Sequence, residues 1–310
     1  MKLHVIYRSY GGENLKNRPA FYSKDVALAS LLRAVDIADV QTELLFLNDG
    51  PIPQYRLGVM EGAGESVSVQ CGSNRRSYGV AIRLPGQRSW DPTDLVWLSE
   101  DDYLYSPDAL AELVTGATQM PAADYFALYC DLEITNVAGR RPEIVRQQPY
   151  HEVSSPTGDL ARRRWYRAAA STSTFGGRVA AMREDERMLR LCSYSGGAWD
   201  RASCLTYQGF QPYPWANLWR DGAAESRLRM ARGIRTAARG VVRSGLNVTA
   251  LARRPKHRRR LAAVGPNPIT HMELPYLASG TPWSAIAADT RAWAISRGMY
   301  LSAELTGGWN

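Results

Sequence analysis

The sequence lacks a long apolar run. None of its 310 residues lies in a stretch that approaches the ~20 consecutive apolar residues needed to span a bilayer. The first apolar run, residues 3–7, is cut short by Arg8 and lacks the length of a signal-peptide core. We therefore expect a cytoplasmic protein whose contact with a membrane, if it has one, is peripheral.

Cysteine and histidine are also scarce. The four cysteines stand at wide spacings and form no C-x-x-C pair, which argues against a structural zinc site and against a disulfide framework. The four histidines leave few candidates for imidazole chemistry. With 45% hydrophobic and 22% charged residues, the composition is that of a globular protein and excludes disorder as a global description.

Acidic residues are nearly missing from one segment. Residues 223–264 hold twelve Lys and Arg against one acid, Glu225, which gives this segment a charge of +11. Because the whole chain carries +8, the remainder is slightly acidic at −3. The basic character is therefore local. It belongs to an amphipathic helical pattern at 223–246 and to the tail at 253–260.

Short apolar segments alternate with helical patterns over residues 1–130. Strands that alternate with helices form a mostly parallel sheet, and ligands bind beyond the carboxyl ends of its strands. The expected strands are 3–7, 43–47, 66–70, 95–98 and 125–130, with helices over 23–38 and from Ser73 and Ser106 onward. In the second half we expect a polar, turn-rich excursion at 139–164, a strand at 171–175 and helices at 179–191 and 199–207. The polar residues that follow strands are Arg8, Ser9, Asn48, Asp49, Asn74, Arg75, Glu100, Asp101 and Asp102. We predict an α/β, Rossmann-like fold with helices on both faces of the sheet.

Three consecutive acids, Glu100, Asp101 and Asp102, follow the apolar strand at 95–98. Carboxylates crowded at the edge of a hydrophobic sheet repel one another unless a cation or hydrogen-bond donors neutralise them. Oxygen ligands of this kind are typical of a divalent metal site. The alternative is an acidic turn that caps the following helix, where negative charge is favourable.

The segment from Val96 to Tyr105, followed by Pro107-Asp108-Ala109-Leu110, resembles the metal-binding D-x-D-type motif, here as E-D-D, of glycosyltransferases with the GT-A fold. The resemblance implies that Asp102 binds Mn²⁺ or Mg²⁺ and that Asp101 faces the donor ribose or sugar. Other segments resemble, in the same order, bacterial enzymes similar to glycosyltransferase family 2. These segments are Arg18–Lys24, Ser171–Phe175 with the helix behind it, and Thr270–Leu277.

The last of these segments contains His271, which the resemblance places near the metal. It implies that His271 is the second protein ligand, as a neutral imidazole oriented by an acceptor on its other nitrogen. The alternative is a histidine at the start of a helix with no ligand role. The resemblance covers most of the chain from Arg8 to Trp283 and fails between Trp219 and Pro266, where the basic helix has the character of an insertion.

The resemblance to GT-A glycosyltransferases implies how the chain is divided by function. We predict a single catalytic domain over residues 1–310 with a nucleotide-sugar donor half and an acceptor half. The donor half is 1–130, the acceptor half is 131–218 and 266–310, and a basic helical arm at 219–265 lies between them.

A nucleoside diphosphate concentrates negative charge, so cationic strand-end residues are candidates to contact it. Arg8, Lys24 and Arg75 fit contacts to the diphosphate or the base, with Ser9 and Asn74 beside them. Asn48 and Asp49 fit acceptors for ribose hydroxyls or the base. For each of these residues a solvated loop position is an equal alternative. We expect a nucleotide-diphosphate sugar as donor, with a UDP-sugar preferred.

Inverting transfer to a hydroxyl requires a carboxylate near the acceptor, because a hydroxyl is a poor nucleophile until its proton is being removed. Asp200 occupies the position where similar enzymes place this base at the start of a helix, although the adjacent Gly196-Gly197 departs from their pattern. Ordinary capping of that helix is the alternative. Asp131 and Glu133 are the next candidates.

Other functions are alternatives to a glycosyltransferase. The basic arm at 227–260 has the charge to bind nucleic acid, an anionic membrane surface or a second copy of the chain, but no nucleic-acid recognition motif accompanies it. A sugar nucleotidylyltransferase is a further alternative, although Tyr10-Gly11-Gly12-Glu13-Asn14 lacks the basic glycine-rich loop of such enzymes. We expect a nucleotide-sugar donor, a glycan, lipid-linked or protein acceptor, and no nucleic-acid partner.

Overall fold

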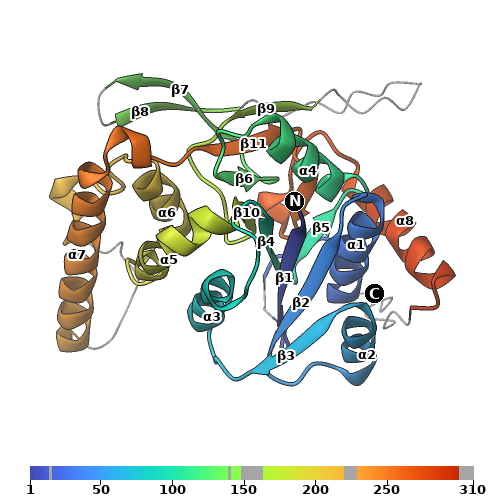
Figure 1. The fold of residues 1–310 in the computed structure, drawn as a ribbon. Coiled ribbons are helices and arrows are strands. Elements are labelled where there is room, and N and C mark those ends of the chain that lie inside the picture. Colours follow the sequence, from blue (N-terminus) through green and yellow to red (C-terminus); the bar gives the residue numbers. More distant parts are fainter. Residues whose placement is uncertain (14–15, 139–140, 148–162, 220–228, 300–310) are drawn as a thin grey trace.

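An eight-stranded sheet runs through the centre of the molecule, in the strand order β3-β2-β1-β4-β10-β6-β11-β9 (Figure 1). The computed structural model describes residues 1–13, 16–138, 141–147, 163–219 and 229–299. The sheet strands are β1 Leu3–Tyr10, β2 Thr42–Asp49, β3 Glu65–Val69, β4 Leu95–Glu100, β6 Tyr125–Ala127, β9 Arg164–Arg167, β10 Phe175–Arg178 and β11 Leu261–Gly265. Neighbouring strands from β3 to β4 are parallel, whereas β10 and β9 run antiparallel to their neighbours.

Helices cover both faces of this sheet, so its apolar strands are buried on both sides. On one face, α1, α2 and α4 pack over residues such as Leu3, Val5 and Trp97, and α8 packs against α1. On the other face, α3, α5, α6 and α7 cover residues such as Ile6 and Val96. The helices are α1 Lys24–Ile37, α2 Gln54–Ala63, α3 Asn74–Gln87, α4 Ala109–Gln119, α5 Val179–Cys192, α6 Trp199–Tyr207, α7 Arg229–Ala252 and α8 Trp283–Ser296.

Two small sheets complete the fold. β5 (Tyr103–Tyr105) pairs antiparallel with β12 (Ile269–His271), and β7 (Leu132–Ala138) pairs with β8 (Arg141–Arg146). Single-turn helices lie at η1 Trp215–Asn217, η2 Pro255–His257 and η3 Leu274–Tyr276. The β5–β12 pair matters most for function because it joins the acid turn after β4 to a segment nearly 170 residues later in the chain.

The predicted fold class is confirmed: the protein is α/β, with a mostly parallel sheet between layers of helices. Serine caps begin two of the predicted helices. The Ser23 hydroxyl accepts a hydrogen bond from the Asp25 N–H, and the Ser73 hydroxyl accepts one from the Arg76 N–H. The predicted helix at 199–207 has the same bounds in the structure.

Three predictions for the second half differ from the structure. The strand expected at 171–175 lies at Phe175–Arg178 instead. The polar excursion expected at 139–164 contains the strand β8, and its last residue, Arg164, is the first residue of β9. The last five residues of the expected arm, 261–265, form β11 inside the central sheet, because this short apolar run pairs with β6 and β9.

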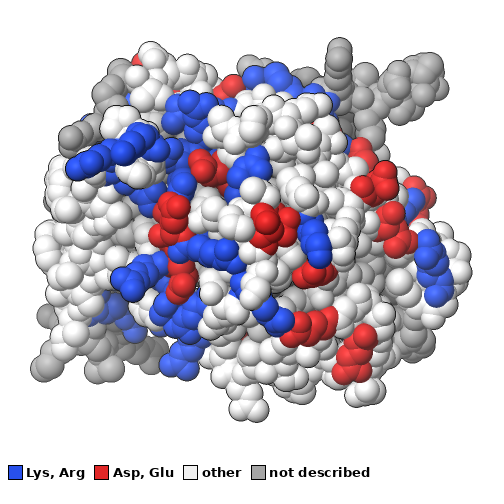
Figure 2. Space-filling model, viewed as in Figure 1, with Lys and Arg blue, Asp and Glu red and all other residues white. Residues whose placement is uncertain are grey.

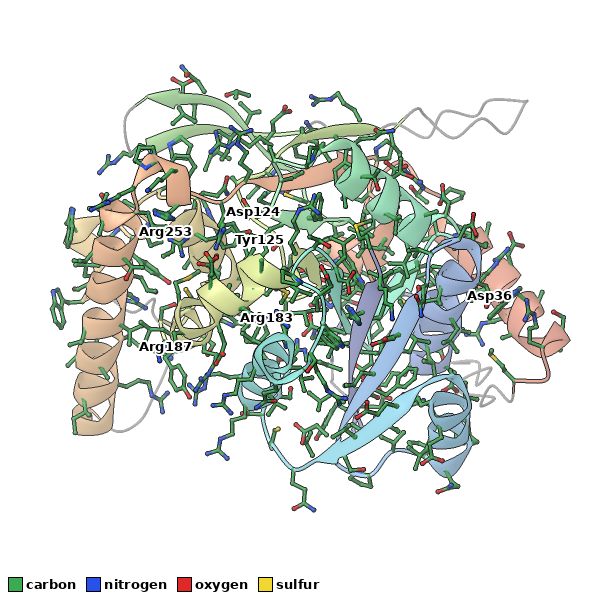
Figure 3. The ribbon with its side chains drawn as sticks, in the orientation of Figure 1. Asp36, Asp124, Tyr125, Arg183, Arg187 and Arg253 are labelled. Carbon is green, nitrogen blue, oxygen red and sulfur yellow. The ribbon has the colours of Figure 1, made fainter. Side chains whose placement is uncertain are left out.

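The basic helix extends to Ala252, six residues beyond the predicted end, and two arginines of the basic arm have partners inside the protein. Arg243 is buried and donates to the backbone carbonyls of Ser195 and Leu218. Just after the end of α7, Arg253, labelled in Figure 3, pairs with the buried Asp185 of α5. The predicted start of the helix at 223–228 lies outside the described residues.

Exposed Lys and Arg side chains gather near the C-terminal end of α7. Figure 2 shows Lys and Arg side chains clustered over the C-terminal end of α7 and the segment that follows it, whereas the outer edge formed by α7 itself is largely uncharged. Arg254, Lys256 and Arg260 are exposed in this segment. Among the helices in the described ranges, none combines the length and apolar character required to cross a membrane.

Candidate active site

The three acids occupy a tight turn at the carboxyl end of the sheet. β4 ends at Glu100 and β5 begins at Tyr103, so Asp101 and Asp102 form the turn between them. The parallel register sets Glu100 beside Arg8 at the end of β1. Next to this turn lies a cavity of about 590 Å³. Its wall includes the sequence-predicted residues Arg8, Ser9, Asp49, Asn74, Asp101, Asp102, Asp200 and His271.

Each acid of the turn has its own cationic partner in the protein. Glu100 Oε1 lies 2.6 Å from Arg8 Nη2, and Asp101 Oδ2 lies 3.1 Å from Lys24 Nζ. Asp102 is paired with both Lys16 and Arg18. The crowding of negative charge therefore does not by itself require an external ion, which corrects the electrostatic argument drawn from the sequence.

Arg8 is buried and held in a defined orientation. Its Nη1 donates to Asn74 Oδ1 at 2.7 Å and to the Ser77 hydroxyl at 3.2 Å, so Asn74 holds Arg8 as well as lining the cavity. Arg8 Nε and the neighbouring Ser9 hydroxyl are buried without a hydrogen-bond partner among the described residues. Both residues line the cavity, but these two atoms are themselves shielded from solvent.

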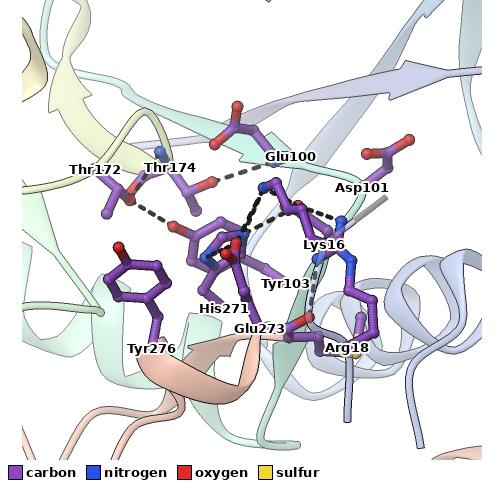
Figure 4. Close-up of polar contacts among 12 residues, drawn as sticks. Lys16, Arg18, Glu100, Asp101, Tyr103, Thr172, Thr174, His271, Glu273 and Tyr276 are labelled. Carbon is purple, nitrogen blue, oxygen red and sulfur yellow. Dashed lines mark hydrogen bonds and ion pairs between the residues drawn. The ribbon is translucent and has the colours of Figure 1, made fainter. Parts of the chain in front are cut away.

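The structure brings His271 to Asp102, from which it is 169 residues away in the chain. Figure 4 shows the His271 ring beside that of Tyr103. β5 pairs with β12 so that Tyr103 lies opposite His271, and the two rings stack with centroids 5.0 Å apart. His271 Nε2 lies 3.0 Å from Asp102 Oδ2, and His271 Nδ1 lies 3.8 Å from Glu273 Oε2. Glu273 is therefore near the other ring nitrogen, at a distance longer than a hydrogen bond.

Cations converge on the same oxygen of Asp102. Lys16 Nζ lies 3.3 Å and Arg18 Nη2 lies 3.1 Å from Asp102 Oδ2. Burial opposes ionisation of this carboxyl, but hydrogen bonding with His271 and the positive charges around it prevail. They hold the pKa of Asp102 well below its ordinary value. Asp102 is thus a carboxylate throughout the physiological range, as a cation ligand must be.

Few metal-binding side chains among the described residues surround Asp102. In the described parts of the chain, no three His, Cys, Asp or Glu side chains are grouped closely enough to hold a metal. Asp102 and His271 supply two donors, and the Lys16 ammonium stands between them as a cation. The pair fits an ion of the Mg²⁺ or Mn²⁺ type, which commonly takes one or two protein ligands and completes its shell with substrate phosphates and water.

Three predicted donor-binding residues lie outside the cavity wall. Lys24 is buried, donates to the backbone carbonyl of Tyr10 and fixes Asp101. Asn48 is buried and donates to the Ser66 hydroxyl on β3. Arg75 is exposed and stacks over the Tyr194 ring. Their positions indicate supporting roles in the fold, in contrast to that of Asp49.

Asp49 lines the cavity at the end of β2 in a fixed orientation. Its Oδ1 accepts hydrogen bonds from the backbone N–H groups of Cys71 and Gly72, at 2.8 Å and 3.4 Å. These bonds anchor one oxygen of the carboxylate and tie the loop after β3 to β2. Asp49 therefore sits where a nucleoside bound across the strand ends would pass.

Asp200 lies in the first turn of α6 and lines the cavity together with Thr172 and Ser173. Its Oδ1 accepts a hydrogen bond from the Arg201 N–H at 2.8 Å. Burial raises the pKa of the Asp200 carboxyl above its ordinary value. The other two candidates for the base, Asp131 and Glu133, lie outside the cavity wall and pair with Arg146 and Arg164.

Several site residues were not assigned a role from the sequence. Lys16 and Arg18 come from the loop between β1 and α1, and a lysine in a polar loop carries no distinguishing pattern. Arg18 lies in a segment that resembles a family motif, which was its one available signal. Tyr103, Thr172 and Tyr129 also line the cavity. The Thr174 hydroxyl accepts the Glu100 N–H and so helps to shape the acid turn.

Comparison with known proteins gives a likeness of fold. Neither a protein-family profile nor a curated protein matches the sequence. TarS from S. aureus, also solved with UDP and with UDP-GlcNAc, has a TM-score of 0.40 and 14% identity over 66% of this chain. The match spans 56% of the TarS chain.

Two further solved structures resemble the chain to a similar degree. CMP:2-keto-3-deoxy-manno-octonic acid synthetase, solved with CTP, matches 96% of this chain and 100% of its own, with 11% identity and a TM-score of 0.40. 4-Diphosphocytidyl-2C-methyl-D-erythritol synthase matches 76% of this chain and 97% of its own, with 12% identity and a TM-score of 0.39. At these values the likeness concerns the fold and assigns no activity.

Proposed function

We propose that the protein is a glycosyltransferase that moves a sugar from a nucleotide-diphosphate donor to a hydroxyl acceptor with inversion. One observation carries the proposal. A single cavity at the carboxyl ends of the strands is lined by the acid turn, by His271 and by the carboxylate of Asp200. Charge-binding groups and a candidate base thus face the same space, as a displacement at an anomeric carbon requires.

The donor nucleotide is assigned to the part of the cavity next to β1 and β2. Arg8 and Ser9 line the cavity there beside the strand ends, and Asp49 offers a carboxylate with one anchored oxygen. Asp101 is held by Lys24 and by the Tyr10 N–H at 2.8 Å, which fixes it as an acceptor for a ribose or sugar hydroxyl. A UDP-sugar is the donor we expect.

Asp102 and His271 are the residues assigned to hold Mn²⁺ or Mg²⁺. When bound, such an ion supplies positive charge to the departing diphosphate. Arg18 provides a second positive charge at the same place, because its guanidinium is fixed by the Met272 carbonyl at 2.8 Å and by the Tyr22 ring. Asp200 takes the proton of the acceptor hydroxyl, and its raised pKa makes it a stronger base than an exposed aspartate.

A surface of α7 is assigned to an anionic membrane. Ile234, Val241 and Val248 repeat every seven residues along its outer side and are 69%, 64% and 59% exposed. The exposed Lys and Arg side chains gather next to this apolar row, at the C-terminal end of α7, and residues 226–264 contain no acid, so anionic lipid complements this part of the surface. This face would bring the enzyme to a lipid-linked or cell-surface acceptor.

Product analysis tests the proposed reaction directly. The protein is incubated with nucleotide sugars and Mn²⁺, and in parallel with sugar phosphates and nucleoside triphosphates. Release of a nucleoside diphosphate in the first mixture is the expected result. Release of pyrophosphate in the second would replace the proposal with a sugar nucleotidylyltransferase.

A further inference from the structure

The ammonium of Lys16 lies close to the side chains of His271 and Glu273 (Figure 4) and to the carboxylate of Asp102, and these four residues form one cluster. Its Nζ lies 3.3 Å from Asp102 Oδ2, 3.3 Å from Glu273 Oε2 and 3.4 Å from His271 Nε2. Two carboxylates and one imidazole nitrogen therefore surround a single positive charge. Asp102 and His271 are also the two donors assigned above to a divalent ion, so the ammonium and the ion would share one position.

The two occupants exclude each other for electrostatic and chemical reasons. A divalent ion bound to Asp102 Oδ2 and His271 Nε2 would meet the ammonium at contact distance, where like charges repel strongly. The contacts within the protein also occupy both donor atoms. Asp102 Oδ2 accepts hydrogen bonds from Lys16, Arg18 and His271 Nε2, so neither that oxygen nor that nitrogen presents a free lone pair to an ion in this arrangement. Lys16 must leave before the ion can enter.

Lys16 is the member of the cluster with the freedom to leave. Its side chain is 35% exposed, whereas those of Arg18 and Asp102 are 12% and 10% exposed. Arg18 is further fixed by the Met272 carbonyl and by stacking on Tyr22. Lys16 has neither restraint and lines the same cavity that is assigned to the nucleotide.

We propose that Lys16 is a built-in counter-ion that closes the divalent-ion site in the free protein and moves to the donor diphosphate when the nucleotide binds. The inference rests on the proposed function, because it takes the ion and the diphosphate from it. The diphosphate gives the ammonium a new anionic partner, so its departure from Asp102 costs less when the nucleotide is present. Divalent-ion binding is thereby coupled to nucleotide binding.

The test measures Mn²⁺ binding directly, by the paramagnetic resonance signal of free Mn²⁺, with and without UDP. The variant is Lys16→Met, which removes the ammonium and keeps the length of the side chain. The matched control is Lys2→Met, since Lys2 is 41% exposed and also pairs with a carboxylate, that of Glu43. Thermal unfolding of each variant establishes that it is folded, and Lys16→Gln serves as a second substitution.

In the wild type we expect weak Mn²⁺ binding alone and binding strengthened by UDP. Without UDP, Lys16→Met should bind Mn²⁺ about tenfold more tightly than the wild type, within the usual range of coupling between sites. UDP should strengthen Mn²⁺ binding less in Lys16→Met than in the wild type. Lys2→Met should bind Mn²⁺ as the wild type does, with and without UDP. Mn²⁺ binding by Lys16→Met that equals or falls below the wild-type level without UDP would overturn the role of Lys16.

An Asp102→Asn variant separates this failure from failure of the proposed function. If Asp102→Asn loses Mn²⁺ binding while Lys16→Met binds as the wild type does, the ion site stands and the role of Lys16 is rejected. If Asp102→Asn binds Mn²⁺ as well as the wild type, the ion is held elsewhere, and both the assigned metal ligands and the role of Lys16 are rejected.

Discussion

At the scale of single residues, the role proposed for Asp200 as the base can be tested directly. It faces the cavity from the first turn of α6, and its burial disfavours the charged form. Replacement by asparagine keeps the shape and removes the base. We expect Asp200→Asn to lower turnover by about 10²- to 10⁴-fold, the usual contribution of a general base, while UDP binding is retained. Steady-state kinetics and calorimetric titration of UDP measure the two quantities, and full activity would eliminate the assignment.

The raised pKa of Asp200 also predicts a pH dependence. A base acts in its deprotonated form, so turnover should fall as the pH decreases through the pKa of this carboxyl. Because burial raises that pKa, the fall should occur above the ordinary value of ~3.9 for aspartate. The measurement is a profile of turnover against pH at saturating donor. A profile that stays flat down to that ordinary value would show that another group takes the proton.

Sequence reasoning located the residues at strand ends better than those in loops. The positions of Asp102 and Asp49 follow from the apolar strands before them, so the cavity wall they form was predictable. Lys16 and Arg18 reach the site from the loop before α1, and their pairing with Asp102 depends on tertiary folding that no local pattern encodes. The pairing of all three acids with protein cations was unpredictable for the same reason.

At the scale of elements, one buried carboxylate helps to anchor the segment that follows α7. Asp185 of α5 is 2% exposed, pairs with Arg253 and Arg259, and accepts a hydrogen bond from the Tyr125 hydroxyl at 3.0 Å. Loss of one partner from a buried ionic network leaves charge without compensation. We expect Asp185→Asn to lower the free energy of unfolding by about 3–5 kcal/mol in denaturant titrations.

The neighbouring residue provides the control for this prediction. Glu186 pairs with Arg190 one helical turn away at the surface of α5, at 3.0 Å. A surface pair of this spacing contributes about 0.3–0.5 kcal/mol. Glu186→Gln should therefore leave the free energy of unfolding nearly unchanged. Equal effects of the two substitutions would contradict the structural role assigned to Asp185.

Elements in the first half follow from sequence more closely than those in the second. The strands β1, β2 and β4 contain apolar runs between helical patterns, whereas β3 alternates polar residues with valine. This succession of strands and helices matches a parallel sheet. The Ser171–Thr174 segment has strand-like residues, but the Thr172 hydroxyl accepts the N–H of Thr174 and the Tyr103 hydroxyl, so local side-chain bonds replace a strand there. β11 was missed because five apolar residues after a basic run give too short a signal.

At the scale of the whole molecule, the outer side of α7 predicts binding to membranes. The protein should sediment with vesicles of phosphatidylcholine and phosphatidylglycerol, and salt should weaken the binding. Val241→Glu should abolish it, because the substitution places an acid in the apolar row. Ile295→Glu on α8, at a residue 67% exposed, is the control and should bind as the wild type does.

Two results would contradict the membrane assignment. Equal binding to pure phosphatidylcholine would show that anionic lipid is not recognised. A dimer in solution that Val241→Glu dissociates would show instead that a second copy of the chain covers this face.

The central claim is that the acid turn binds a nucleoside diphosphate together with a divalent ion. Calorimetric titration of UDP, and of the other nucleoside diphosphates, into the wild type and Asp102→Asn with and without Mn²⁺ tests it most directly. We predict that one diphosphate binds the wild type more tightly with Mn²⁺ and that Asp102→Asn loses this enhancement. Binding that Mn²⁺ does not change, or that Asp102→Asn retains in full, would contradict the account.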